Sequence, residues 1–183
     1  MTTKTRATIE DLYRVREDGK AELVDGNLLL MQPTGDYPGR ASGNIYISLR
    51  QYESRTRSGY AYSDNVGFRV TLPNRESFSP DASYFIGERT GMKFLNGAPI
   101  FAAEVRSEGD YGPSAEQEMA AKRRDYFAAG TLVVWDVDLL GEDVIRSYSR
   151  ENPETPTVCR RGEFATAIPA LPDWTFPVDD LFD

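Results

Sequence analysis

An apolar run, an amphipathic helix and a second apolar run follow one another in the middle of the chain, and this order restricts the possible folds strongly. Ile100 to Arg106 reads as a strand, Ser114 to Ala129 as a helix that stops at Gly130, and Thr131 to Val137 as a buried strand. A helix between two such strands supplies a right-handed crossover between parallel neighbours. The unit therefore predicts an α/β protein whose two central strands are covered on both faces.

The remaining periodic segments predict a mixed sheet flanked by helices, with an N-terminal β-hairpin. The 183 residues suit a single domain, residues 1–183, with a sizeable core. The other predicted elements are a helix from Thr8 to about Arg16, a hairpin of Ala21–Val24 and Asn27–Met31, a helix over Ala41–Thr56, strands over Tyr60–Ser63, Gly67–Leu72, Phe78–Ile86, Val144–Ser149, Thr157–Arg160 and Glu163–Ala167, and a Pro-rich tail anchored by Trp174 and Phe176.

Two carboxylates lie at the ends of predicted strands. Asp81 follows Pro80 and leads into an apolar run, and Glu104 ends the run that starts at Pro99. A carboxylate beside a buried strand is costly unless something pairs with it, and two of them on neighbouring strands repel each other. A divalent cation removes that penalty, and Mg²⁺ typically binds one or two carboxylates plus water and substrate phosphate. The pair therefore predicts a metal site suited to phosphodiester hydrolysis.

The composition excludes several other kinds of active site. The chain has no histidine and one cysteine, Cys159. Ser-His-Asp and Cys-His catalysis, histidine-ligated zinc and a thiolate zinc site within the chain are therefore ruled out. Any metal must be a hard cation with oxygen ligands. Proton transfer must use a carboxylate, a lysine, a tyrosine or metal-bound water.

The helix over Ser114–Ala129 offers a lysine to the two carboxylates. At 100° per residue, Met119 and Tyr126 fall on the inward stripe, and Lys122 lies on its flank. Lys122 is therefore predicted to reach the carboxylates, whereas Tyr126 is predicted to pack in the core. The position two residues after Glu104 holds Arg106, which is always charged and cannot activate water as a lysine can.

These motifs together resemble the Uma2 (DUF820) group of the PD-(D/E)XK nuclease superfamily. The resemblance covers roughly residues 21–149. It implies a restriction-endonuclease-like fold in which the lysine is displaced from the strand to the following helix. The segments that carry the resemblance are Pro80-Asp81, Glu104-Val105-Arg106-Ser107, Lys122–Gly130, Glu22-Leu23-Val24-Asp25-Gly26 and Val133–Asp138.

The motifs and the resemblance predict a Mg²⁺- or Mn²⁺-dependent endonuclease that cleaves DNA, with RNA as an open alternative. Asp81 and Glu104 are expected to hold the metal, with the Val105 carbonyl as a third protein ligand, and Lys122 to orient the attacking water. Glu22 is either a further acidic contributor or an ordinary hairpin surface residue. Asp136 and Asp138 are a weaker second metal pair, since acids at a strand end more often cap the next turn. A homodimer would suit cleavage of both strands of a duplex.

The charge balance keeps a second function open. The net charge of −8 opposes non-specific nucleic-acid binding, which relies on basic surface. The turn Glu108–Gly112 after the Glu104 strand also departs from the turn usual in the group that the chain resembles. Together these features favour the alternative of a catalytically degenerate nuclease fold that binds nucleic acid or protein. The polar N-terminus, the single cysteine and the lack of a stretch of roughly 20 apolar residues lead us to expect a cytoplasmic protein with no membrane segment.

Overall fold

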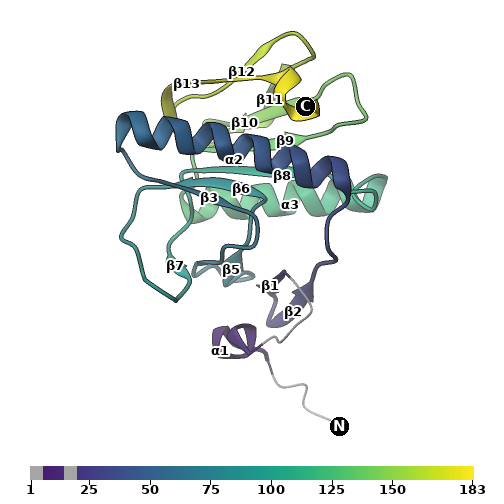
Figure 1. Ribbon diagram of the computed structural model, residues 1–183. Coiled ribbons are helices and arrows are strands. Elements are labelled where there is room, and N and C mark those ends of the chain that lie inside the picture. The colour runs from purple at the N-terminus through teal and green to yellow at the C-terminus, as the bar shows by residue number, and fades with distance from the viewer. Residues whose placement is uncertain (1–5, 15–19) are drawn as a thin grey trace.

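A six-stranded mixed sheet forms the centre of the protein in the computed structural model, which describes residues 6–14 and 20–183 (Figure 1). The strand order is β11-β10-β9-β8-β6-β3, and only β8 and β9 run parallel. Helix α3 (Pro113–Ala129) connects these two strands, so the predicted crossover is confirmed. The six strands are β3 (Tyr60–Ser63), β6 (Ala82–Phe85), β8 (Phe101–Val105), β9 (Val133–Val137), β10 (Ile145–Ser149) and β11 (Asn152–Cys159).

Two layers cover the two faces of this sheet. Helix α2 (Asp36–Thr56) packs on one face together with the C-terminal segments, and α3 packs on the other face with a small three-stranded sheet (Figure 1). The C-terminal segments are β12 (Phe164–Ala167), β13 (Leu171–Pro177) and the 3₁₀ helix η1 (Val178–Phe182), and the small sheet is β5 (Ser77–Phe78), β4 (Phe68–Arg69) and β7 (Leu95–Asn96).

Strand alternation decides which side chains face which layer. In β8, Phe101, Ala103 and Val105 join the core beneath α2, whereas Ala102 joins the core beneath α3. Successive side chains of a strand point to opposite faces, so Glu104 lies on the α3 side with Ala102. This geometry aims the carboxylate at the helix that carries Lys122.

The N-terminal part adds a short helix, α1 (Ile9–Tyr13), and the predicted hairpin of β1 (Ala21–Val24) and β2 (Asn27–Leu30). A capping box between Thr8 and Asp11 starts α1 as the sequence predicts. Its predicted end near Arg16 lies outside the described residues. β1 docks beside β5 through backbone contacts such as the 2.9 Å hydrogen bond from the Glu76 N–H to the Leu23 carbonyl.

Several predicted boundaries differ from the structure. The strand predicted over Gly67–Leu72 is shortened to β4, and the strand predicted over Thr157–Arg160 is the longer β11. The second helix begins at Asp36 because Pro38 is tolerated in a first helical turn, where its missing N–H has no partner to lose. The predicted strand over Phe78–Ile86 is divided into β5 and β6, since Pro80 cannot donate to a ladder and the chain changes sheets there. The Pro-rich tail forms the unpredicted strand β13, although its anchors Trp174 and Phe176 are buried as expected.

No helix within the described ranges is long and apolar enough to cross a membrane.

Candidate active site

The carboxylates predicted at the strand edges come together where β8 ends and β6 begins. Asp81 lies directly before β6, and its backbone N–H donates to the Ala103 carbonyl of β8 at 3.1 Å. Asp81 and Glu104 both lie on the α3 side of the sheet by strand alternation. The two residues therefore have the same-face arrangement that a shared cation requires.

Lys122 reaches Glu104 from α3, but its contacts with the described residues do not include Asp81, which it was also predicted to approach. Its Nζ lies 2.9 Å from Glu104 Oε2 and 2.9 Å from Glu22 Oε1. Tyr126, one helical turn later, donates its hydroxyl to Glu104 Oε1 at 2.6 Å, and its ring stacks on Phe78 with centroids 4.0 Å apart. Lys122 thus lies on the inward flank of the helix as predicted. Tyr126 packs in the core, also as predicted, and in addition holds the second oxygen of Glu104.

Glu22 belongs to the cluster and is not an ordinary hairpin surface residue. Its side chain is 1% exposed, and it accepts a hydrogen bond from the Ser79 backbone N–H at 3.0 Å. The guanidinium of Arg75 pairs with its other oxygen and also donates to Asp125 at 2.8 Å. Burial opposes ionisation of Glu22, but Lys122 and Arg75 outweigh it and lower the pKa of its carboxyl below the ordinary value.

Asp81 is held by a second lysine, Lys20, which was not predicted from the sequence. Lys20 Nζ lies 2.5 Å from Asp81 Oδ1 and 2.8 Å from Asp64 Oδ1, and the Val105 N–H donates to Asp81 Oδ2 at 2.7 Å. Lys20 stands two residues before Glu22, so the period of a strand places both side chains on one face. From this spacing, the position of Lys20 beside the carboxylates could have been predicted.

The charged groups of the cluster shift one another's pKa values. Burial and the negative charge of Asp81 raise the pKa of the Glu104 carboxyl, against the opposing effect of Lys122. Burial disfavours the charged form of Lys122, yet Glu104 and Glu22 raise the pKa of its ammonium. Burial also raises the pKa of the Tyr126 phenol well above its ordinary value, assisted by Glu104. Lys122 therefore stays charged, and Tyr126 stays a hydrogen-bond donor, at neutral pH.

The other charged residues near the ends of β8 and β9 have structural partners. Arg106 is 4% exposed and forms two 2.8 Å hydrogen bonds with Asp136, so its guanidinium is engaged by that carboxylate, and within the described residues it forms no hydrogen bond with Glu104. Asp138 accepts hydrogen bonds from the backbone N–H groups of Leu140 and Gly141 at 3.0 Å, which is the turn cap expected for an acid after a strand. The weaker hypothesis of a second metal pair gains no support from these contacts.

The donor set of Asp81 and Glu104 fits a hard cation. Each of their four oxygens accepts one hydrogen bond from the protein, and a carboxylate oxygen retains a second acceptor direction. Within residues 6–14 and 20–183, no three acidic, histidine or cysteine side chains form a ready-made cage. An ion here would take its remaining ligands from backbone, water or substrate, as Mg²⁺ commonly does.

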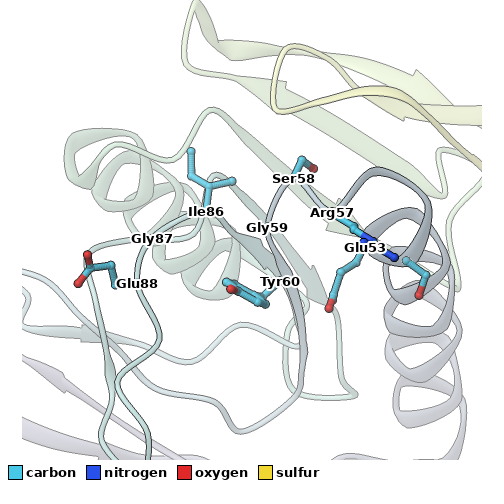
Figure 2. Close-up of a pocket in the computed structure, with 9 residues that line it drawn as sticks. Glu53, Arg57, Ser58, Gly59, Tyr60, Ile86, Gly87 and Glu88 are labelled. Carbon is cyan, nitrogen blue, oxygen red and sulfur yellow. The ribbon is translucent and has the colours of Figure 1, made fainter.

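A surface cavity of about 780 Å³ lies elsewhere on the protein (Figure 2). Tyr60 opens β3 and Ile86 follows β6, so the cavity is at the opposite end of these strands from Asp81. Glu53 and Arg57 line it from the end of α2. The carboxylate cluster and this cavity are therefore separate features of the molecule.

Comparisons with known proteins agree with this architecture. A family model described as "Putative restriction endonuclease", Uma2, matches residues 7–179. The structure is similar to that of a "putative nuclease belonging to DUF820" from Anabaena variabilis ATCC 29413, with a TM-score of 0.74 and 16% sequence identity over 96% of this chain and 97% of that one. No curated protein matches the chain. Because the family model spans nearly all of the sequence, the chain belongs to the Uma2 family.

Proposed function

We propose that this protein is a metal-dependent endonuclease that hydrolyses DNA phosphodiester bonds. The observation that carries the proposal is the position of Lys122, whose ammonium lies 2.9 Å from Glu104 near the end of β8, where Asp81 leads into the neighbouring strand β6. Two carboxylates and a lysine on adjoining elements are the groups that a PD-(D/E)XK-type site requires. Membership of the Uma2 family and the nuclease-like neighbour support the same reaction class.

Asp81 and Glu104 would hold Mg²⁺ or Mn²⁺, with the Val105 carbonyl as the third protein ligand. When bound, such an ion polarises a phosphoryl oxygen and lowers the pKa of bound water. The protein prepares the two carboxylates for this task. The Val105 N–H orients Asp81, and the Tyr126 hydroxyl orients Glu104. Outer-shell hydrogen bonds of this kind fix ligand geometry and raise metal affinity.

Lys122 would orient the attacking water and offset the negative charge that develops on the phosphate. Its ammonium is fixed between Glu22 and Glu104, so it is preorganised before substrate arrives. Glu22 contributes by holding Lys122 and by keeping it charged. Its own burial and its two other partners, Arg75 and Ser79, suit this orienting role better than direct metal binding.

Incubation of the purified protein with supercoiled plasmid, single-stranded DNA and RNA tests the proposal. Mg²⁺ or Mn²⁺ should produce nicked and linear plasmid, and EDTA should prevent it. Lys122→Met should retain Mn²⁺ binding and lose cleavage. A wild-type protein that binds DNA or protein but cuts no nucleic acid with either metal would favour the alternative of a degenerate interaction module.

The proposal extends to the assembly and the compartment. A homodimer with two-fold symmetry would place two sites on opposite strands of a duplex. Light scattering after gel filtration measures this, and a monomeric mass with and without DNA would refute it. The single cysteine, Cys159, is buried and free, which suits the reducing cytoplasm.

A further inference from the structure

The candidate site contains two lysine ammonium groups, and the proposed reaction uses only one of them. Lys20 stands directly before β1 and binds Asp81, whereas Lys122 binds Glu104 and Glu22. Its side chain is 12% exposed, although lysine usually keeps its ammonium in water. A lysine buried this far needs a reason, and its partners supply one.

Those partners are one carboxylate of the predicted metal site, Asp81, and a neighbouring acid, Asp64. Nζ of Lys20 contacts Asp81 Oδ1 at 2.5 Å and Asp64 Oδ1 at 2.8 Å. Burial opposes its charge, but Asp81 and Glu104 raise the pKa of this ammonium above its ordinary value. Lys20 therefore contacts one of the two proposed metal ligands, Asp81, directly.

The position of this ammonium conflicts with a bound cation. Asp81 Oδ2 already accepts the Val105 N–H, and Lys20 covers Oδ1. A divalent ion on Asp81 would meet a positive charge in contact with its own ligand, and two cations at that range repel each other strongly. Asp64 follows β3 and is not among the proposed ligands, so it offers the ammonium a second place to bind.

We propose that Lys20 is a tethered counter-ion that neutralises Asp81 in the metal-free protein and is displaced toward Asp64 when a divalent metal binds. The inference rests on the proposed function, because it takes Asp81 and Glu104 as the metal ligands. Lys20 lets the acidic cluster fold without metal, and its displacement lowers the metal affinity of the site. Lys20 thus sets the metal concentration at which the site fills.

Calorimetric titration of the metal-free protein with Mn²⁺ tests the effect on affinity. Lys20→Met should bind Mn²⁺ about tenfold more tightly or better, since a contact charge pair near a protein surface exceeds the free energy of one decade. Lys20→Arg keeps the charge and should not bind more tightly than wild type. Lys93→Met is the matched control, because Lys93 is exposed and packs over Tyr13 instead of the cluster. It should leave the affinity unchanged.

Asp64→Asn tests the path of the displacement. Removal of the second partner leaves Lys20 more firmly on Asp81, so Mn²⁺ affinity should fall. In the double variant Lys20→Met, Asp64→Asn the affinity should match that of Lys20→Met alone. A loss of affinity of the same size in both backgrounds would make Asp64 a direct metal ligand and would overturn the proposed path.

Acetylation of the lysines followed by mass spectrometry gives a readout that is independent of activity. The chain has only Lys4, Lys20, Lys93 and Lys122, so each site can be followed. Lys20 should be protected relative to Lys93 without metal and should become labelled as Mn²⁺ binds. Equal Mn²⁺ affinity in wild type and Lys20→Met, with Lys20 still protected, would overturn the displacement and leave the metal site intact. Absence of Mn²⁺ binding to both proteins would overturn the metal site and this inference together.

Discussion

The ammonium of Lys122 lies 2.9 Å from the carboxylate of Glu22, whose side chain is 1% exposed. Lys122 therefore has a structural partner as well as a proposed catalytic one, Glu104. A buried carboxylate that loses a cation is costly, so the two roles must be separated experimentally. The variants below distinguish loss of chemistry from loss of stability.

Lys122→Met keeps the aliphatic stem and removes only the ammonium. We expect cleavage at saturating Mg²⁺ to fall by roughly 10²-fold or more, the scale of losing a positioned catalytic group. Mn²⁺ binding should persist, because Asp81 and Glu104 remain. The measurement is the single-turnover rate of plasmid nicking.

Arg124→Ala is the matched control for Lys122→Met, since Arg124 is an exposed neighbour on the same helix. Any effect of this variant should act through DNA affinity and should weaken as salt rises. Equal single-turnover rates in wild type and Lys122→Met would remove Lys122 from the mechanism.

Glu22→Gln should destabilise the protein at neutral pH and flatten the acid side of its stability curve. The folded-state pKa of Glu22 is below its ordinary value of 4.5. Its ionised form therefore stabilises the fold above about pH 4.5, and this contribution is lost as the pH falls through the lower folded-state pKa. Denaturant unfolding of wild type and variant between about pH 3 and 7, roughly the range in which carboxyl groups titrate, measures this contribution to the free energy of unfolding. A variant with the same pH dependence as wild type would exclude this role.

Glu104→Gln should act with the opposite sign in metal-free protein. The folded-state pKa of Glu104 is raised above 4.5, so its contribution favours folding at low pH and is lost as the pH rises through the folded value. The variant should therefore gain stability relative to wild type as the pH rises from 4.5 toward neutrality. Thermal unfolding in EDTA follows this difference. A variant that loses relative stability over that range would show that the ion pair with Lys122 outweighs burial.

Tyr126→Phe tests whether orientation of Glu104 matters for metal affinity. The substitution keeps the stacking on Phe78 and removes the 2.6 Å hydrogen bond to Glu104 Oε1. We expect Mn²⁺ affinity to fall by about 10–100-fold, the usual cost of losing an outer-shell partner of a ligand. Stability should fall by only about 1 kcal/mol. Unchanged Mn²⁺ affinity would leave Tyr126 with a packing role alone.

The central part of the fold was predictable because its signals are local. Apolar runs at Ile100–Arg106 and Thr131–Val137, with a helix ending at Gly130 between them, allow few other arrangements. The break between β5 and β6 was harder to predict. Phe78 and the strand-like run Ala82–Ile86 are separated only by Ser79-Pro80-Asp81, so the segment can be taken for one strand. Only the pairing partners reveal that the chain changes sheets there, with β5 on β4 and β6 on β8.

The residues of the candidate site that lie on a helix or at a strand end could be predicted from the sequence, because hydrophobic periodicity shows which way they face. Helical spacing placed Lys122 on the inward flank, and strand edges placed Asp81 and Glu104. Arg75 lies in a turn between short strands, where no periodicity indicates its direction, so its contact with Glu22 could not be predicted. The burial of Glu22 likewise depends on how the hairpin docks on β5, which is a long-range contact.

The dependence of plasmid cleavage on Mn²⁺ in wild type and Asp81→Asn tests whether Asp81 holds a catalytic metal. Among the described residues, the Asp81 side chain forms hydrogen bonds only with Lys20 and the Val105 N–H, so the variant should fold. We expect wild type to cleave supercoiled plasmid with Mn²⁺ and not with EDTA, and Asp81→Asn to stay at background at every Mn²⁺ concentration. Cleavage by Asp81→Asn at the wild-type rate and metal dependence would contradict this expectation.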